Sequence, residues 1–282
     1  MASPFLLYDG SFYPASEPLL PADNRAFRYG EGLFETMRLS KNSIPLWELH
    51  WNRLQNSMPC IGITGPVHWT KEAVFNQIQK LVQKNHHQTS ARIRLTVFKG
   101  EGGIREYPSS PFHSILQSWN LPESAFTWNE NGLQLGIFLK GKKACDHYSH
   151  LKSSNYLLYL MAAQDARERK WNESLVLNQY GRVSDASIAN VFFIKDGVVY
   201  TPSLEEGGVA GVMRQYLIQQ LRQAGRIVQE GAYTLEDIEA AEEIFLTNAV
   251  QGIRWVQSFN NHTYRNRETA EVYRNFLEPL CR

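Results

Sequence analysis

One stretch rich in glycine and proline interrupts this chain, and that interruption constrains the fold more than any other feature. The stretch covers residues 101–130, and it contains Gly102, Gly103, Pro108, Pro111 and Pro122. Strand and helix patterns occur on both sides of it, which is typical of two folded parts joined by a linker. We therefore predict an N-terminal α+β domain over residues 1–118, a linker over 119–125 and a C-terminal α+β domain over 126–282.

Hydrophobic periodicity predicts the elements of both parts. Residues 47–58 and 70–84 carry apolar side chains at helical spacing. In the second part, Asp196-Gly197 between two apolar runs predicts a β-hairpin, and Gly211 directly precedes a predicted helix. Helices fall between groups of strands and do not alternate strictly with them. That order favours an α+β fold over a doubly wound parallel sheet.

Composition excludes several classes of protein. Lys and Arg number 29 against 28 Asp and Glu, a formal charge of +1, so the basic surplus needed to hold nucleic acid is absent. No apolar run approaches the roughly 18 residues of a membrane helix, and the N-terminus shows no signal-peptide pattern. The three cysteines are odd in number and far apart, which indicates a reducing compartment. We expect a cytoplasmic enzyme without a membrane or nucleic-acid partner.

Lys152 is the first candidate for chemistry. It follows a predicted strand and a polar loop, and Ser153 and Ser154 offer an N-cap region for a helix predicted to run to about Lys170. A lysine at such a junction can project into a cleft, and a desolvated lysine loses its proton and becomes a nucleophile toward a carbonyl. The alternative, a solvated loop lysine, is the commoner role of a single lysine.

A glycine-rich turn leads into the predicted helix after Gly211. It has the sequence Gly207-Gly-Val-Ala-Gly-Val-Met-Arg214. Backbone N–H groups at a helix start, with glycine allowing close approach, predict an anion site. Arg53, on the predicted helix at 47–58, can add two parallel hydrogen bonds to a phosphate. An ordinary helix start and a surface arginine are the alternative interpretations.

Asp185 and Arg105 also have a functional and an ordinary interpretation. Asp185 lies between a turn and a strand, and is either a turn residue or the partner of a ring nitrogen. Arg105 lies in a glycine-containing loop and is an anion ligand if that loop faces a substrate. The stretch Cys145–His150 contains metal-binding residue types, but no partner cluster at ligand spacing accompanies it. We therefore predict no metal site.

Together these segments occur in an order that resembles the class IV, or fold type IV, pyridoxal-phosphate enzymes. That family includes branched-chain aminotransferases, D-amino acid aminotransferases and aminodeoxychorismate lyases. The resemblance covers nearly the whole chain, and segments in the family's order are far more specific than any one alone. It rests on Arg28-Tyr-Gly-Glu-Gly-Leu-Phe-Glu-Thr36, His50-Trp-Asn-Arg-Leu54, Leu151-Lys-Ser-Ser-Asn-Tyr-Leu157, Val183-Ser-Asp-Ala-Ser-Ile-Ala-Asn-Val-Phe192, Tyr200-Thr-Pro202 and Gly211-Val-Met-Arg214.

Within this family the chain looks most like an aminodeoxychorismate lyase. Met213 stands where the aminotransferases commonly have threonine, and lyases often have methionine there. The chain departs from the family at Asp185, where glutamate is usual, and Met213 offers only its backbone N–H to a phosphate. Three further segments look lyase-like: the Asn248-Ala249 pair, the Gly-Glu-Gly-Gly loop at 100–103 and the ending at 273–281.

The resemblance implies a two-domain homodimer with pyridoxal 5′-phosphate (PLP) between the domains and a small amine as substrate. It implies that Lys152 carries the cofactor covalently and later moves a proton. Asp185 would keep the pyridine nitrogen protonated, so that the ring acts as an electron sink. The residues implied to hold the phosphate are Arg53, Val212 and Met213, with Asn248 and Ala249 nearby, and those implied to contact substrate are Tyr29 and Arg105.

Three functions remain open from the sequence. The first is a lyase that releases pyruvate and 4-aminobenzoate. The second is an aminotransferase acting on branched-chain or D-amino acids. The third is a phosphate-ligand-binding protein without catalysis, and the presence of Lys152 in its matching segment speaks against it.

Overall fold

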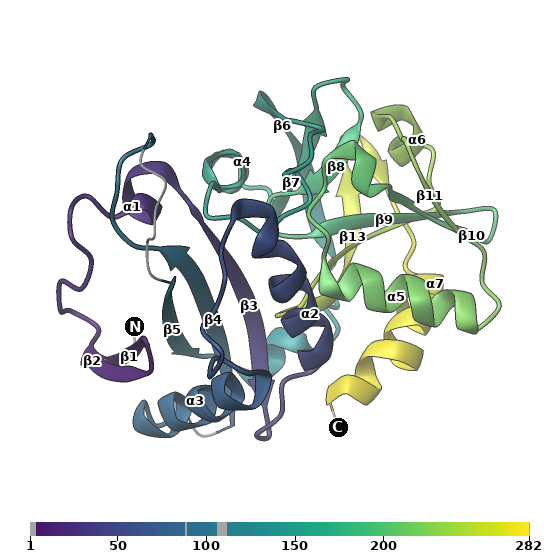
Figure 1. Ribbon diagram of the computed structural model, residues 1–282. Helices are drawn as coiled ribbons and strands as arrows, with labels where there is room; N and C mark the ends of the chain where they lie inside the picture. Colours follow the sequence, from purple (N-terminus) through teal and green to yellow (C-terminus); the bar gives the residue numbers. More distant parts are fainter. Residues whose placement is uncertain (1–3, 88, 106–111, 282) are drawn as a thin grey trace. The chain divides into compact units, whose positions relative to one another are not determined.

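The computed structural model divides into two compact units (Figure 1). The chain leaves unit 1 after Ala125 and returns to it for the five residues Leu151–Asn155. The predicted division into two consecutive domains with a linker at 119–125 did not include this return. Unit 1 comprises Met1–Ala125 and Leu151–Asn155, and unit 2 comprises Phe126–His150 and Tyr156–Arg282. The described residues are 4–87, 89–105 and 112–281. Residues 106–111 of the predicted glycine- and proline-rich interruption lie outside them.

Unit 1 is built on a five-stranded antiparallel sheet, in the order β2-β1-β5-β4-β3 among the described residues. A tight turn joins the first two strands, with Asp9 and Gly10 at φ values of 47° and 81°. β5 ends inside the predicted linker. The strands are β1 (Phe5–Tyr8), β2 (Ser11–Pro14), β3 (Gly32–Ser40), β4 (Ser90–Lys99) and β5 (Phe112–Asn120).

Two amphipathic helices complete the core of unit 1. α2 packs against β3, and α3 packs against β1 and β5. Leu54 of α2 and Ile78 of α3 join Met37 and Ile93 of the sheet in one buried cluster, as the helical spacing predicted. The helical segments are α1 (Arg25–Tyr29), α2 (Trp47–Ser57), η1 (Pro59–Ile61), α3 (Lys71–Lys84) and η2 (Glu123–Phe126), the last of which ends at the first residue of unit 2.

Unit 2 contains a nine-stranded mixed sheet, counted over the part of the chain that the structure describes. β10 and β11, β13 and β6, and β6 and β7 pair in parallel, whereas the other neighbours are antiparallel. This mixture agrees with the predicted α+β class. The strands are β6 (Leu133–Lys143), β7 (Glu173–Asn178), β8 (Val183–Ala186), β9 (Asn190–Lys195), β10 (Val198–Pro202), β11 (Val228–Gly231), β12 (Glu243–Asn248), β13 (Gly252–Phe259) and β14 (His262–Thr263).

The helices of unit 2 pack against this sheet. α4 contacts β6 and β7, and α5 and α7 contact β12. The predicted β9–β10 hairpin is confirmed, because Asp196 and Gly197 both have positive φ, as a type I′ turn requires. No helix in the described ranges combines the length and apolar character needed to span a bilayer. The helical segments are α4 (Leu157–Glu168), η3 (Leu204–Glu206), α5 (Val212–Gln223), α6 (Leu235–Glu239), α7 (Arg267–Val272), η4 (Tyr273–Leu277) and η5 (Glu278–Cys281).

The start of α4 corrects one sequence prediction. Ser153 and Ser154 are not its N-cap, because the helix begins at Leu157 with Tyr156 at the N-cap position. The backbone of the two serines is used elsewhere: Ser153 forms a β-bridge with β3, and the N–H of Ser154 donates to the first residue of that strand. A long-range backbone pairing has therefore placed the two serines beside β3, before the helix begins.

A buried carboxylate holds the start of α7. Glu243, at the first position of β12, is 4% exposed and accepts hydrogen bonds from the N–H groups of Glu268 and Thr269 and from the Thr269 hydroxyl. Glu243→Ala would leave these three donors without their acceptor, so we expect the free energy of unfolding to fall by about 3 kcal/mol. Urea titration measures this, with Glu242→Ala at the adjacent exposed position as the matched control. Equal stability of the two variants would contradict the capping role.

Candidate active site

Lys152 is held in unit 1 through its backbone. Its carbonyl accepts a hydrogen bond from the N–H of Phe34 at 2.9 Å, and the N–H of Ser154 donates to the carbonyl of Gly32 at 2.8 Å. The Lys152 ammonium lies over the Phe34 ring, 4.6 Å from its centroid. The peptide on either side of the lysine is thus fixed to β3 independently of the lysine side chain.

A second group in unit 1 links β3 to α2. The buried carboxylate of Glu35 accepts two hydrogen bonds from the guanidinium of Arg53 and one from Nδ1 of His50 at 2.6 Å. Burial raises the pKa of Glu35, but the charge of Arg53 and the hydrogen bond from His50 outweigh it and lower that pKa to about 2. Burial lowers the pKa of His50. Glu35 is therefore ionised, with Arg53 as its charge partner and a neutral His50 as donor.

Asp185 lies in the interior of unit 2, on β8. Its Oδ2 accepts from the backbone N–H of Val209 at 2.7 Å and the hydroxyl of Tyr159 at 3.1 Å, and its Oδ1 accepts from Nδ2 of Asn190 at 2.7 Å. Lys143 is close by, with Nζ 5.0 Å from the centroid of the Tyr159 ring. Burial raises the pKa of Asp185 to about 6 although these donors oppose it. A cation placed against this carboxylate would restore its ionised form.

The sequence predicts an anion site at the start of α5. Gly211 is the N-cap, and no side chain of the described residues caps the helix, so the N–H groups of Val212 and Met213 open a 12-residue helix without such a partner. A Cβ on Gly211 would lie 1.9 Å from Oδ1 of Asn190, so the close approach of the two segments requires glycine. The same asparagine also holds Asp185. One side chain thus connects the carboxylate to the helix start.

The predicted Asn248-Ala249 pair marks the end of β12, against which α5 packs. Oδ1 of Asn248 accepts hydrogen bonds from the N–H groups of Val250 and Gln251, at 3.0 and 2.8 Å. This local turn fixes the backbone around Ala249, which is half-buried. The asparagine therefore shapes the loop through its own backbone contacts.

The remaining predicted residues lie in less constrained places. Tyr29 ends α1 and is flanked by two guanidinium groups, those of Arg25 and Arg28, at 5.6 and 5.0 Å from its ring centroid. Arg105 is exposed at the end of a described range. No three His, Cys, Asp or Glu side chains gather as metal ligands among the described residues, including the stretch Cys145–His150.

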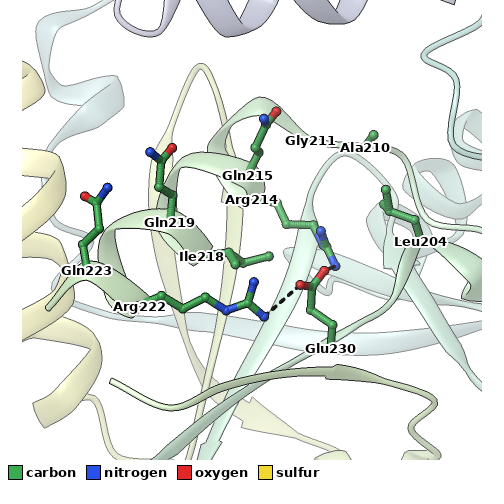
Figure 2. Close-up of a pocket in the computed structure, with 10 residues that line it drawn as sticks. All are labelled: Leu204, Ala210, Gly211, Arg214, Gln215, Ile218, Gln219, Arg222, Gln223 and Glu230. Atoms are coloured by element: carbon green, nitrogen blue, oxygen red, sulfur yellow. Dashed lines mark hydrogen bonds and ion pairs between the residues drawn. The ribbon is translucent and has the colours of Figure 1, made fainter. Parts of the chain in front are cut away.

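A cavity of about 480 Å³ runs along α5 in unit 2 (Figure 2). Arg214 and Arg222 both donate to the carboxylate of Glu230, at 2.7 and 3.0 Å, so its two cationic side chains share one anionic partner. Ala210, Gly211 and Arg214 of the glycine-rich turn line it, but Lys152, Asp185 and the other residues predicted to contact cofactor or substrate do not, so we do not assign it to catalysis. Its lining residues are Leu204, Ala210, Gly211, Arg214, Gln215, Ile218, Gln219, Arg222, Gln223 and Glu230.

The sequence contained a signal for Glu35 that our prediction did not use. Alternation along β3 puts Glu35 on the same face as Leu33 and Met37, two core residues, so a charge stands in an otherwise apolar row. A buried carboxylate needs a partner. His50 and Arg53, three residues apart on one predicted helix, were candidates for that partner.

The comparisons with known proteins show the family of the chain. The family model of amino-transferase class IV matches residues 32–259, and the chain therefore belongs to that family. An aminodeoxychorismate lyase of Vibrio harveyi is 28% identical over 83% of this chain and 85% of its own length. A D-alanine aminotransferase of Listeria monocytogenes is 25% identical over 92% of this chain and 90% of its own length. The branched-chain aminotransferase structure from Thermoproteus uzoniensis has a TM-score of 0.87 and 22% identity, covering 99% of this chain and 95% of that one.

This family depends on PLP, and the chain is a PLP-dependent enzyme. Its residues fit that cofactor. Asp185 is a buried carboxylate suited to a cationic partner, and the start of α5 offers N–H groups to an anion. The Asp185 carboxylate and the N–H groups at the start of α5 match the two polar ends of a phosphorylated pyridine, its ring nitrogen and its phosphate.

Proposed function

We propose that this protein is a 4-amino-4-deoxychorismate lyase, which releases pyruvate and 4-aminobenzoate. The carrying observation is that Met213 and the Asn248-Ala249 pair, where the chain looks lyase-like, stand at the start of α5 and the end of β12. These are the places where an enzyme of this family would meet the phosphate. The similarity to the Vibrio harveyi lyase supports the same choice. The homodimer implied by the family resemblance is part of the proposal.

In this proposal five of the predicted residues have a defined task. Arg53 and the N–H groups of Val212 and Met213 bind the phosphate. Asp185, fixed by its three donors, holds a proton on the ring nitrogen by charge attraction. When bound, PLP supplies a sink for the electron pair left on the substrate carbon. The Lys152 amine takes the proton from the carbon next to the substrate nitrogen.

The choice between lyase and aminotransferase depends on what leaves after proton removal. Aminodeoxychorismate carries an enolpyruvyl ether on the carbon beside the one that loses its proton. Expulsion of that ether oxygen with its bonding electron pair makes the ring aromatic, and the released enolate takes up a proton on its CH₂ carbon to become pyruvate. Ordinary amino acids have no such leaving group, so transamination needs a second, keto-acid substrate. A lyase should therefore complete its cycle with one substrate alone.

Supplying aminodeoxychorismate alone tests this proposal. We expect pyruvate and 4-aminobenzoate in equal amounts over many turnovers, because both products come from one molecule. In parallel, leucine or D-alanine is offered with 2-oxoglutarate and amino exchange is measured. Rapid exchange without any 4-aminobenzoate would overturn the lyase and establish the aminotransferase. That second candidate is favoured by the similarity to the Listeria monocytogenes D-alanine aminotransferase over most of the chain.

A further inference from the structure

We propose that Glu35 is a positioning residue that fixes the guanidinium of Arg53 in the orientation needed to bind the cofactor phosphate. The inference rests on the proposed function, since the phosphate-binding role of Arg53 belongs to it. Glu35 itself is 2% exposed and acts through Arg53. It is one of the residues that the sequence prediction did not include.

The geometry of the pair is that of a fork. Nε of Arg53 donates to Oε1 of Glu35 at 2.8 Å, and Nη2 donates to Oε2. Two parallel hydrogen bonds between planar groups fix both the position and the plane of a guanidinium, which a single bond cannot do. Because Nε and Nη2 occupy one edge of the group, the edge carrying Nη1 is directed away from the carboxylate. In the proposed function the phosphate binds on the side of Nη1.

The carboxylate is itself held from a second side. Nδ1 of His50 donates to Oε2 at 2.6 Å, and His50 and Arg53 lie three residues apart on α2. Glu35 thus ties β3 to two positions on neighbouring turns of one helix. The exposed fractions of the three side chains are small, 2% for Glu35, 1% for His50 and 11% for Arg53. Water has little access, so it cannot replace a bond that is lost.

Stability alone is a poor explanation for this arrangement. Removing two charges from water costs free energy that their attraction barely offsets, and apolar residues in the same space are often as stabilising. What a buried fork does provide is a fixed orientation, which lowers the loss of side-chain freedom when a ligand binds. Binding of a phosphate by Arg53 would benefit from that property.

Comparing PLP with pyridoxal tests the proposal, because the two ligands differ only in the phosphate. Both are titrated into the cofactor-free full-length chain, and the ratio of the two dissociation constants reports the phosphate contribution. Arg53→Ala should reduce the preference for PLP by about ten- to a hundredfold. Glu35→Gln should reduce it about tenfold while leaving pyridoxal affinity unchanged, because an amide group puts a donor against either Arg53 or His50. The double variant should match Arg53→Ala.

Two more variants make the result decisive. Glu48→Gln makes the same chemical change on α2 at an exposed ion pair with Lys71 and should leave the ratio unchanged. Glu35→Asp keeps the charge but shortens the fork, so it should lower the ratio less than Glu35→Gln does. The Glu35→Asp variant also tests the positioning role if Glu35→Gln does not fold. An unchanged ratio of the PLP and pyridoxal dissociation constants in Glu35→Asp would overturn the proposal.

The outcomes distinguish the phosphate-binding role of Arg53 from the positioning role of Glu35. If Arg53→Ala leaves the ratio unchanged, the phosphate assignment of the proposed function is wrong, and the inference fails with it. If Arg53→Ala lowers the ratio and Glu35→Gln does not, only the positioning role is wrong. Equal loss of affinity for PLP and pyridoxal in Glu35→Gln would show a general structural role and would also overturn the inference.

Discussion

Replacing Lys152 with alanine is expected to abolish the visible absorbance of the bound cofactor and to lower turnover by at least about 10³-fold. The side chain has two tasks in the proposed function: covalent attachment of the cofactor, and proton transfer at the substrate carbon. Proton transfer by a positioned group contributes about 10²–10⁴-fold by itself. Folding should survive, because the bonds that hold this peptide to β3 come from its backbone.

The matched control for this change is Lys142→Ala, at an exposed position near the end of β6. It should keep both absorbance and turnover. Borohydride reduction of the wild-type enzyme should trap the cofactor on the peptide that contains Lys152, which mass mapping can locate. An adduct on Lys140, Lys142 or Lys143 would show that the assignment of the reactive lysine is wrong.

Asp185→Asn is expected to lower turnover by about 10²-fold or more while PLP remains bound through its phosphate contacts. The change removes the negative charge that holds the ring nitrogen protonated, and loss of a preorganised electrostatic contact costs about 10²–10³-fold in other enzymes. Asp185→Glu retains the charge and should keep measurable activity. Turnover of Asp185→Asn at the wild-type rate would mean that another group pairs with the ring nitrogen.

The same substitution has a measurable effect on the cofactor-free protein. Burial raises the pKa of Asp185 from its ordinary value of 3.8 to about 6, so the folded protein resists ionising it. The stability that this protonated group contributes is fully present below pH 3.8 and is lost as the pH rises through 6, about 3 kcal/mol in total. The free energy of unfolding of the wild type, relative to Asp185→Asn, should therefore fall by about 1 kcal/mol between about pH 5 and pH 7. A difference that does not change with pH would contradict the raised pKa.

Elements with local causes could be predicted from the sequence. The hairpin at Asp196-Gly197 depends on two residues that tolerate positive φ, and α5 begins after Gly211 because glycine permits its close contact with Asn190. The start of α4 could not be predicted in the same way. Ser153 and Ser154 are good N-cap residues, but a β-bridge to a strand about 120 positions earlier uses their backbone. Such a pairing leaves no local pattern.

The candidate site shows the same division. The lysine, the carboxylate of Asp185 and the glycine-rich turn carry their chemistry in their own residue types. The side chains that hold them do not: Tyr159 and Asn190 reach Asp185 from 26 and 5 positions away. Only packing brings the tyrosine there. Glu35 lies between these two cases. The alternation along its strand marks it as a buried charge, but it does not identify Arg53 and His50 as the side chains that it binds.

The return of Leu151–Asn155 to unit 1 limits how this enzyme could have arisen or could be rebuilt by recombination. A gene fragment ending at Ala125 would encode strand β3, to which the Lys152 peptide pairs, but not that peptide itself. A fragment beginning at Phe126 would bring the lysine without the strand that fixes it. Neither fragment alone would therefore hold the Lys152 peptide in its place against β3. Chimeras joined near residue 125 should therefore succeed only when both parents have compatible pairings at this peptide, so the two halves are expected to have diverged together.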